Sequence, residues 1–171
     1  MIIHNRVGIL SHFLPEICLA CLATYAMESL ILTDAGRMVE HVWQELPSYS
    51  PRVGLDIFQV MPNHFHGILI IKADLEQVPI ASVGAEHKDP PQQQHATGSP
   101  LSLLDLIARL KSLTTTQYIR GVKENNWKRF DKKLWGTRFH DHVIRTESAL
   151  QSIRTYIQNN PQKWEFDRLN R

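Results

Sequence analysis

The stretch Leu55 to Ile71, LDIFQVMPNHFHGILII, contains two strand-like runs separated by a turn. The first run ends at Val60 and the second begins at His64, with Met-Pro-Asn between them, so we predict an antiparallel hairpin. Successive side chains of a strand point to opposite faces, so His64 and His66 share one face and Phe65 turns to the other. Two neutral imidazoles arranged in this way suit a divalent metal ion, and a hydrogen-bonded histidine pair at a strand edge has the same pattern.

Apolar residues recur at helical spacing on both sides of this hairpin. The run Asp34 to Leu46 (DAGRMVEHVWQEL) and the run Leu103 to Leu113 repeat them every three or four positions, which is typical of amphipathic helices. Ser102 and Asp105 form a capping box at the start of the second helix. Between the hairpin and this helix, residues 74–100 are rich in Pro, Gln, His and Gly, so we expect a flexible loop there.

A further helix is predicted near the end of the chain. Thr146 is its expected N-cap and Pro161 ends it. The helix presents an apolar stripe of three residues, Leu150, Ile153 and Ile157. Tyr156 and Asn160 are four residues apart, so they lie on one face at the border of that stripe. The tyrosine is either a half-buried core residue or, if this face meets the histidine strand, a functional group beside the imidazoles.

Charge is distributed unevenly along the chain. The 171 residues are 43% hydrophobic and 21% charged with a net charge of +2, which suits one compact domain spanning residues 1–171. Residues 109–145 alone contain ten Lys or Arg against three acids, so this segment is strongly basic. Four aromatic residues lie between these charges: Trp127, Phe130, Trp135 and Phe139. The segment suits a nucleic-acid backbone with stackable bases, and a solvated basic face above core aromatics has the same composition.

The N-terminal region contains a single C-x-x-C, formed by Cys18 and Cys21. Without a second pair we interpret these cysteines as buried thiols and not as a metal or redox site. The apolar stretch Ile17 to Met27 is too short to span a bilayer. We therefore expect a cytoplasmic protein without a membrane partner.

Two separated motifs carry a family resemblance. MPNHFHGILII, followed far downstream by LWGTRFHDHVIRTESALQSIRTYIQNNPQKW (134–164), resembles the REP-associated tyrosine transposases, a branch of the single-tyrosine HUH transposases of small insertion sequences. The resemblance runs from about Ile31 to Trp164. It implies an α+β fold with a ferredoxin-like antiparallel sheet and helices packed on one face. It also implies that His64 and His66 are metal ligands, that Asn160 is the third ligand and that Tyr156 is the catalytic nucleophile.

The chemistry that the resemblance implies is transesterification of single-stranded or hairpin DNA with Mg²⁺ or Mn²⁺ as cofactor. Tyr156 would form a 5′-phosphotyrosine bond and release a 3′-OH, and Lys111 is a candidate helper for deprotonating it. Five basic residues would contact DNA phosphates while the aromatics stack on bases: Arg120, Lys123, Lys128, Arg129 and Arg138. The resemblance implies either a monomer or a homodimer, and the sequence does not decide between them.

Two alternatives remain open in the sequence. Residues 1–30 do not show the strand with which relatives usually begin, and their Leu and Ala content with Pro15 favours a helix or an irregular segment. A missing strand beside the histidines would leave an inactive remnant that still binds DNA. His140 and His142 form a second H-x-H, so a zinc-dependent hydrolase that uses both pairs is the other alternative, although the resemblance treats this motif as structural or as a DNA contact.

Overall fold

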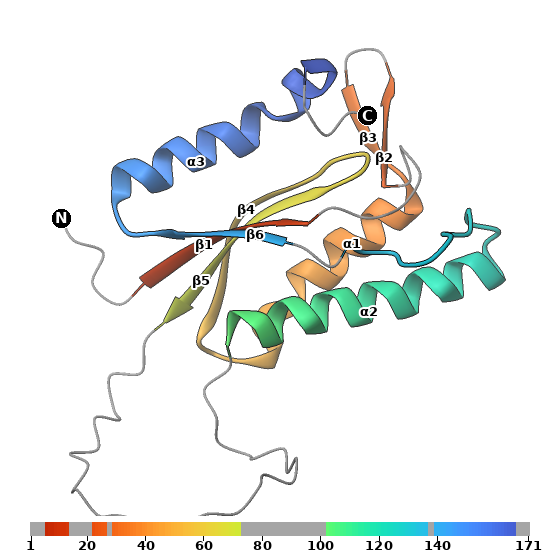
Figure 1. The fold of residues 1–171 in the computed structure, drawn as a ribbon, viewed down its shortest axis with the longest axis horizontal. Coiled ribbons are helices and arrows are strands. Elements are labelled where there is room, and N and C mark those ends of the chain that lie inside the picture. Colours follow the sequence, from red (N-terminus) through yellow and green to blue (C-terminus); the bar gives the residue numbers. More distant parts are fainter. Residues whose placement is uncertain (1–5, 14–21, 27–28, 73–101, 137–138, 167–171) are drawn as a thin grey trace, which may run out of the picture.

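The computed structural model describes residues 6–13, 22–26, 29–72, 102–136 and 139–166 (Figure 1). Four strands form an antiparallel sheet in the order β4-β5-β1-β6, and two more form a separate ladder. The strands are β1 (Arg6–Phe13), β2 (Ala23–Ala26), β3 (Ser29–Leu32), β4 (Val53–Val60), β5 (Phe65–Lys72) and β6 (Phe139–Ile144). The predicted loop at 74–100, the Cys18/Cys21 pair and Arg138 lie outside the described residues.

The order of the elements is that of a ferredoxin-like fold. Helix α1 (Asp34–Gln44) lies between β1 and the β4–β5 hairpin, and α2 (Leu103–Glu124) lies between that hairpin and β6. The β2–β3 ladder is inserted before α1, and α3 (Glu147–Asn159) follows β6. Short 3₁₀ turns, η1 (Leu46–Tyr49) and η2 (Pro161–Phe166), follow α1 and α3. The predicted α+β class with an antiparallel sheet is therefore confirmed.

The hairpin predicted from residues 55–71 is present. β4 and β5 pair antiparallel, with Val60 opposite Phe65, and the Met61 N–H donates to the His64 carbonyl (2.8 Å) to close the turn. β5 begins at Phe65, so His64 is the last residue of the turn and His66 is the second residue of the strand. The turn thus presents the two histidines at one end of β5.

The predicted helix starts are also present. Ser102 and Asp105 form the expected capping box of α2, and the Thr146 hydroxyl accepts a hydrogen bond from the Ala149 N–H (3.2 Å) at the start of α3. α1 begins at Asp34 as predicted, and the chain then continues into η1 instead of extending the helix to Leu46. None of the helices in the described part of the chain is long and apolar enough to cross a membrane.

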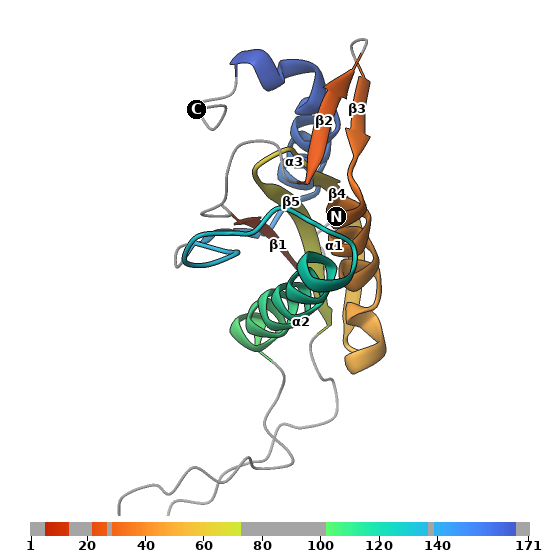
Figure 2. The same cartoon turned by 90° about the vertical axis from the view of Figure 1, so that its right-hand side faces the viewer.

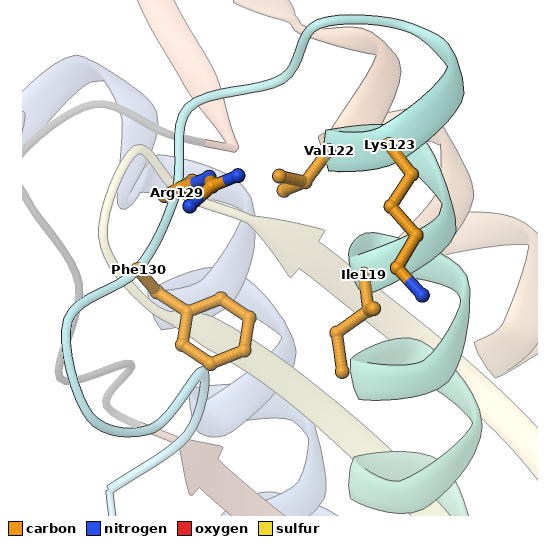
Figure 3. Close-up of a pocket in the computed structure, with 5 residues that line it drawn as sticks. All are labelled: Ile119, Val122, Lys123, Arg129 and Phe130. Carbon is orange, nitrogen blue, oxygen red and sulfur yellow. The ribbon is translucent and has the colours of Figure 1, made fainter.

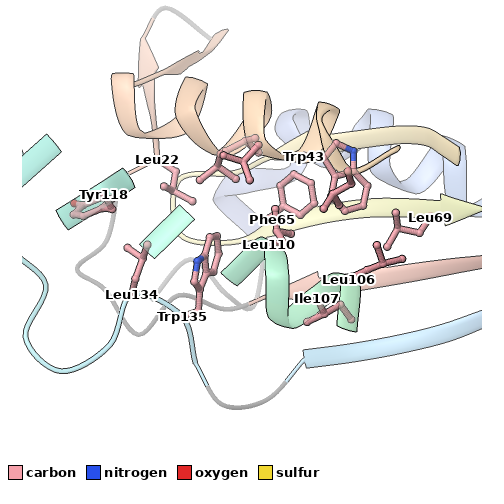
Figure 4. Packing of buried hydrophobic residues seen from close by; sticks show 14 of the residues in the cluster. Leu22, Trp43, Phe65, Leu69, Leu106, Ile107, Leu110, Tyr118, Leu134 and Trp135 are labelled. Carbon is pink, nitrogen blue, oxygen red and sulfur yellow. The ribbon is translucent and has the colours of Figure 1, made fainter. Parts of the chain in front are cut away.

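The larger hydrophobic core lies between the sheet and the helices α1 and α2 (Figure 4). Trp43 of α1 packs on Phe65 of β5 with ring centroids 4.8 Å apart, and both side chains are fully buried. Gly67 provides the space for this contact, because a Cβ atom there would lie 2.6 Å from the Trp43 ring. Leu106, Leu110 and other apolar residues of α2 complete this layer.

A second cluster occupies the opposite face of the sheet. Ile157 of α3 packs with Ile68 of β5 and Ile144 of β6, and Leu150 and Ile153 of the predicted stripe join them. α3 therefore lies across the sheet from α2 (Figures 1 and 2). The expectation of helices on one face holds for α1 and α2 and is wrong for α3, because β5 presents apolar residues on both faces.

The prediction of a helix or an irregular segment at the N-terminus is wrong where the structure describes this region. β1 pairs with β5 on one side and with β6 on the other, so residues 6–13 form one of the two inner strands of the sheet. The pairing partners of β1 lie at residues 65–72 and 139–144, so no short stretch of sequence around residues 6–13 contains them.

Candidate active site

The two histidines of the hairpin lie in direct contact. Their Nε2 atoms are 3.0 Å apart, and the ring planes meet at 79° with centroids 4.6 Å apart. Both His64 and His66 are fully buried. The H-x-H pattern therefore places two imidazole nitrogens at one point, as the strand geometry predicts, although His64 precedes the strand itself.

Helix α3 adds the other two predicted residues to this point. Asn160 is 4% exposed, and its Nδ2 lies 3.0 Å from His66 Nε2 although 94 positions separate them in the chain. Tyr156 is 50% exposed, and its ring stands edge-on to the His66 ring with centroids 5.5 Å apart. Tyr156 belongs to neither hydrophobic cluster, so the interpretation of this residue as part of the core is wrong.

The contacts of the imidazoles constrain their protons. Asn63 Oδ1 lies 2.9 Å from His64 Nδ1 and can only accept, so Nδ1 carries a proton and a neutral His64 has a lone pair on Nε2. His66 Nε2 would then have to donate to His64 and also accept from Asn160 Nδ2, which one nitrogen of a neutral ring cannot do. A divalent metal ion on the two Nε2 lone pairs would remove this conflict, provided that the Asn160 amide is reversed so that Oδ1 faces the ion.

The amide of Asn160 points to the same requirement. Its Oδ1 is buried and has no hydrogen-bond partner among the described residues. An unsatisfied buried acceptor costs on the order of 1–3 kcal/mol, so a ligand that satisfies it is favoured. Reversing the amide would present Oδ1 beside His66 Nε2, which itself lies 3.0 Å from His64 Nε2, so that three electron-pair donors come together. No group of three or more His, Cys, Asp or Glu side chains that could hold a metal occurs in the described part of the chain.

Lys111 lies away from this set. It is on α2, which covers the opposite face of the sheet from α3, and its Nζ donates to the Gly136 carbonyl (2.8 Å). Burial lowers the pKa of Lys111 below its ordinary value. The structure does not bring Lys111 to Tyr156, so the position of this lysine gives the helper role no support.

The predicted DNA-contacting residues gather at the end of α2 and in the segment after it. Arg120 pairs with Glu124 (2.7 Å) on the exposed surface of the helix. Lys123 and Arg129 line an open hollow of about 220 Å³ between α2 and the following segment (Figure 3). Three apolar residues form the rest of its lining, Ile119, Val122 and Phe130. Lys128 is exposed beside them, and its carbonyl accepts from the Tyr118 hydroxyl (2.9 Å).

The aromatic residues of the basic segment serve mainly the core. Trp135 is buried, and its Nε1–H donates to the Thr114 hydroxyl (2.7 Å). Trp127 and Phe130 stand edge-on to the buried Tyr118, with centroids 5.3 and 5.8 Å from it. The prediction that these aromatics stack on bases is therefore wrong for Trp135, while Phe130 also borders the hollow. The side chain of Phe139 lies outside the described residues.

Several neighbours of the site were not singled out from the sequence. Trp164 of η2 lies against His64 with ring centroids 5.9 Å apart, and Asn63 fixes the proton of the same ring. Arg154 of α3 forms an ion pair with Asp56 of β4. The sequence offered a reason to single out Asp56, because it is the one charged residue in the apolar run LDIFQV.

The rival H-x-H does not add a described ligand to this site. His142 is exposed on β6, opposite Leu10 of β1. The side chain of His140 lies outside the described residues, and the backbone register places it opposite His12 of β1. The structure therefore gives the zinc hydrolase no third or fourth ligand among the residues it describes.

Comparison with known proteins identifies the fold first. The chain shares its fold with the solved structure of a REP-associated tyrosine transposase bound to a REP hairpin, with a TM-score of 0.58 and 17% identity over 98% of this chain and 73% of that one. The resemblance seen in the two sequence motifs is thus confirmed at the level of fold. No protein-family model matches the chain.

A sequence relative then gives the family. An uncharacterized protein of Haemophilus influenzae (strain ATCC 51907 / DSM 11121 / KW20 / Rd) is 33% identical over 147 residues, which cover 83% of this chain and 73% of that protein. The chain belongs to the same family as this Haemophilus influenzae protein.

Proposed function

We propose that this protein is a transposase-like DNA endonuclease and strand transferase that cuts single-stranded hairpin DNA through a covalent 5′-phosphotyrosine intermediate on Tyr156. One observation carries the proposal: a half-exposed tyrosine stands edge-on to His66, whose buried Nε2 lies 3.0 Å from both His64 Nε2 and Asn160 Nδ2. The fold shared with a transposase bound to a REP hairpin supports it.

All the atoms that form or break bonds in the covalent step belong to Tyr156 and the DNA. The Tyr156 Oη attacks the scissile phosphorus, the bond from phosphorus to the 3′-oxygen breaks, and the phenolic proton ends on that oxygen as a 3′-OH. The 5′ end stays on the tyrosine as a phosphodiester, so attack by a 3′-OH reverses the step and rejoins DNA. The exposure of Tyr156 leaves it accessible to a DNA strand, while His66 supports one edge of its ring.

His64, His66 and Asn160 would hold the divalent cation. When bound, the cation supplies positive charge that offsets the charge developing on the scissile phosphate. Imidazole nitrogen is a softer ligand than the oxygens that Mg²⁺ prefers, so Mn²⁺ suits this set better than Mg²⁺ does. Asn63 keeps the proton of His64 on Nδ1 and thereby leaves Nε2 as the ligand atom.

The DNA partner would contact the basic end of α2 and the segment after it. Lys123 and Arg129 lie on either side of an apolar hollow that includes Phe130, an arrangement that suits phosphates at the rim and a base inside. Lys128 and Arg120 extend this positive surface, and Glu124 partly offsets Arg120. The alternative of an inactive remnant rested on a missing strand, and β1 supplies that strand.

Formation of a covalent adduct tests the nuclease activity. Labelled single-stranded hairpin DNA from the flanks of the gene is incubated with the protein and Mn²⁺ or EDTA, and SDS-resistant complexes are measured. We expect an adduct that needs Mn²⁺ and disappears in Tyr156→Phe. Tyr49→Phe is the matched control, because it removes a hydroxyl from a tyrosine under Arg109 on the α1 side of the sheet and should leave the adduct unchanged. Tight binding without any adduct would favour the inactive remnant.

Direct metal binding tests the ligand set without relying on activity. Electron paramagnetic resonance of free Mn²⁺ should show one bound ion in the original protein and at least about tenfold weaker binding in His66→Ala and Asn160→Ala. His142→Ala, which changes an exposed histidine on β6, is the control and should bind Mn²⁺ normally. Equal loss in the His142 variant would support the rival site built from both H-x-H pairs.

A further inference from the structure

The position of α3 along the sheet sets the geometry of the whole site, because this helix carries Tyr156 and ends at its C-cap Asn160. The apolar contacts of α3 are few: Ile157 is its only fully buried residue, and Leu150 and Ile153 are partly buried. A packed stripe of this kind holds a helix against a sheet, but hydrophobic burial is non-directional and does not by itself mark one position along the strands. Something more specific is needed to fix the helix at one position.

An irregularity in β4 provides a specific contact. The register of β4 against β5 shifts between Leu55 and Phe58, which forms a β-bulge. In a regular strand Asp56 and Ile57 would face opposite sides, whereas here both face α3: Asp56 pairs with Arg154, and Ile57 joins the Ile68 cluster. Leu55 and Phe58 on either side pack into the other core. The bulge thus turns two consecutive residues, one charged and one apolar, toward the helix.

The Asp56–Arg154 ion pair joins β4 to α3 through several short contacts. Arg154 Nη2 lies 2.6 Å from Asp56 Oδ2, and its Nε lies 3.1 Å from both carboxylate oxygens. The side chains are only 34% and 13% exposed, so water screens the pair less than it screens a surface pair. Burial opposes ionisation of Asp56, but hydrogen bonds from Arg154 and from the Ile57 N–H outweigh it, so the pKa of Asp56 lies below its ordinary value.

Contacts along α3 and η2 occur in the same order as positions along β5. Arg154 reaches the bulge opposite Ile68, Asn160 reaches His66, and Trp164 reaches His64. A slide of the helix by one turn, about 5.4 Å, would break each of these contacts at once. The site residues therefore lie between an ionic contact at one end and an aromatic contact at the other.

We propose that Asp56 and Arg154 are positioning residues: the bulge and its ion pair fix α3 along the sheet so that Tyr156 and Asn160 meet His66. This role rests on the proposed function for its consequence in DNA cleavage, and on the fold alone for its effect on α3. A displacement of about 1 Å of a reacting group reduces a rate by about a hundredfold, so an unfixed helix is expected to lower cleavage strongly.

A rival role for Arg154 is direct contact with a DNA phosphate. The two roles predict different results for Asp56→Asn, which removes the ion pair but leaves the arginine. If the pair positions the helix, Asp56→Asn and Arg154→Gln should lower the rate of adduct formation equally, by about 10- to 100-fold. Their affinity for the hairpin should stay within about twofold of that of the original protein. If Arg154 contacts a DNA phosphate instead, Arg154→Gln should weaken DNA binding, and Asp56→Asn should leave DNA binding unchanged or make it stronger. The charge exchange Asp56→Arg with Arg154→Asp restores part of the rate only in the first case.

Hydrogen exchange of the α3 amides gives a readout that does not depend on catalysis. We expect faster exchange at residues 150–159 in Asp56→Asn and Arg154→Gln, and recovery in the charge-exchanged protein. Arg37→Met is the matched control, because it breaks an exposed ion pair with Asp34 on α1 and should change neither exchange in α3 nor cleavage.

The two readouts separate the possible failures. An active protein whose Arg154→Gln variant cleaves at the original rate overturns the positioning role and leaves the proposed function intact. An original protein without any adduct, but with the expected change of exchange in α3, contradicts the proposed function and leaves the positioning role standing. Unchanged exchange in all variants overturns the positioning role whatever the activity.

Discussion

Gly67 follows His66 directly, and the absence of a side chain at this position is part of the packing beside the site. A Cβ atom at this position would lie 2.6 Å from two atoms of the Trp43 ring and 2.8 Å from the Phe65 ring. Trp43 and Phe65 are fully buried and in contact with each other, so neither ring has free space into which it can move. Gly67→Ala therefore forces β5 and α1 apart at the residue next to the site.

The size of the effect follows from overpacking a closed core. Inserting one methyl group into such a contact destabilises a protein by about 1–3 kcal/mol. For a domain of this size, each kcal/mol lowers the melting temperature by about 2–4 °C. We expect a decrease of about 2 kcal/mol in the free energy of unfolding, and a melting temperature lower by about 4–8 °C.

Chemical and thermal unfolding of matched glycine variants measure this effect. Gly54→Ala in β4 is the control, because its Cβ would meet Ile70 at an ordinary distance of 3.5 Å, and we expect a change within about 0.5 kcal/mol. Trp43→Phe combined with Gly67→Ala should be less destabilised than the sum of the single variants, since the smaller ring relieves the clash. Equal stability of Gly67→Ala and Gly54→Ala would refute the packing described for this face of β5.

Three further predictions concern other parts of the molecule. Thr114→Val should cost about 1–3 kcal/mol in urea unfolding because it leaves the buried Trp135 Nε1–H without its acceptor, and adding Trp135→Phe should recover part of this loss. The pKa of Asp56 is lower in the folded protein than in the unfolded chain, so its contribution to stability is present above about pH 4 and is lost as the pH falls through the pKa of the folded protein. Asp56→Asn should therefore make the free energy of unfolding decline less steeply in acid. Lys123→Gln and Arg129→Gln should each weaken hairpin binding and lower the slope of log affinity against log salt by about 0.7–0.9, and an unchanged slope would remove the residue from the DNA surface.

The elements that the sequence predicts well are those with one buried face. The stripe of α3, the caps Ser102 and Thr146 and the turn at Met61 all depend on local spacing or local hydrogen bonds, and the structure has each of them where predicted. The H-x-H contact is of the same kind, because it depends on two residues in one strand end.

The elements that the sequence misses depend on distant partners. β1 is recognisable as a strand only through its pairing with β5 and β6, which lie more than 50 residues further along the chain. The opposite location of α3 depends on Ile68 having a cluster of its own on the second face of β5. The ion pair between Asp56 and Arg154 joins residues 98 positions apart and depends on a bulge that no local pattern announces.

Mapping the covalent adduct by mass spectrometry identifies the residue to which the DNA becomes attached. Trypsin releases residues 155–163 as one peptide, TYIQNNPQK, in which Tyr156 is the single tyrosine. After reaction with hairpin DNA and Mn²⁺ followed by nuclease digestion, this peptide should carry a 5′-nucleotide through a phosphodiester on Tyr156, and the modification should be absent with EDTA. An adduct on any other residue, or its formation at full yield without metal, would contradict the account.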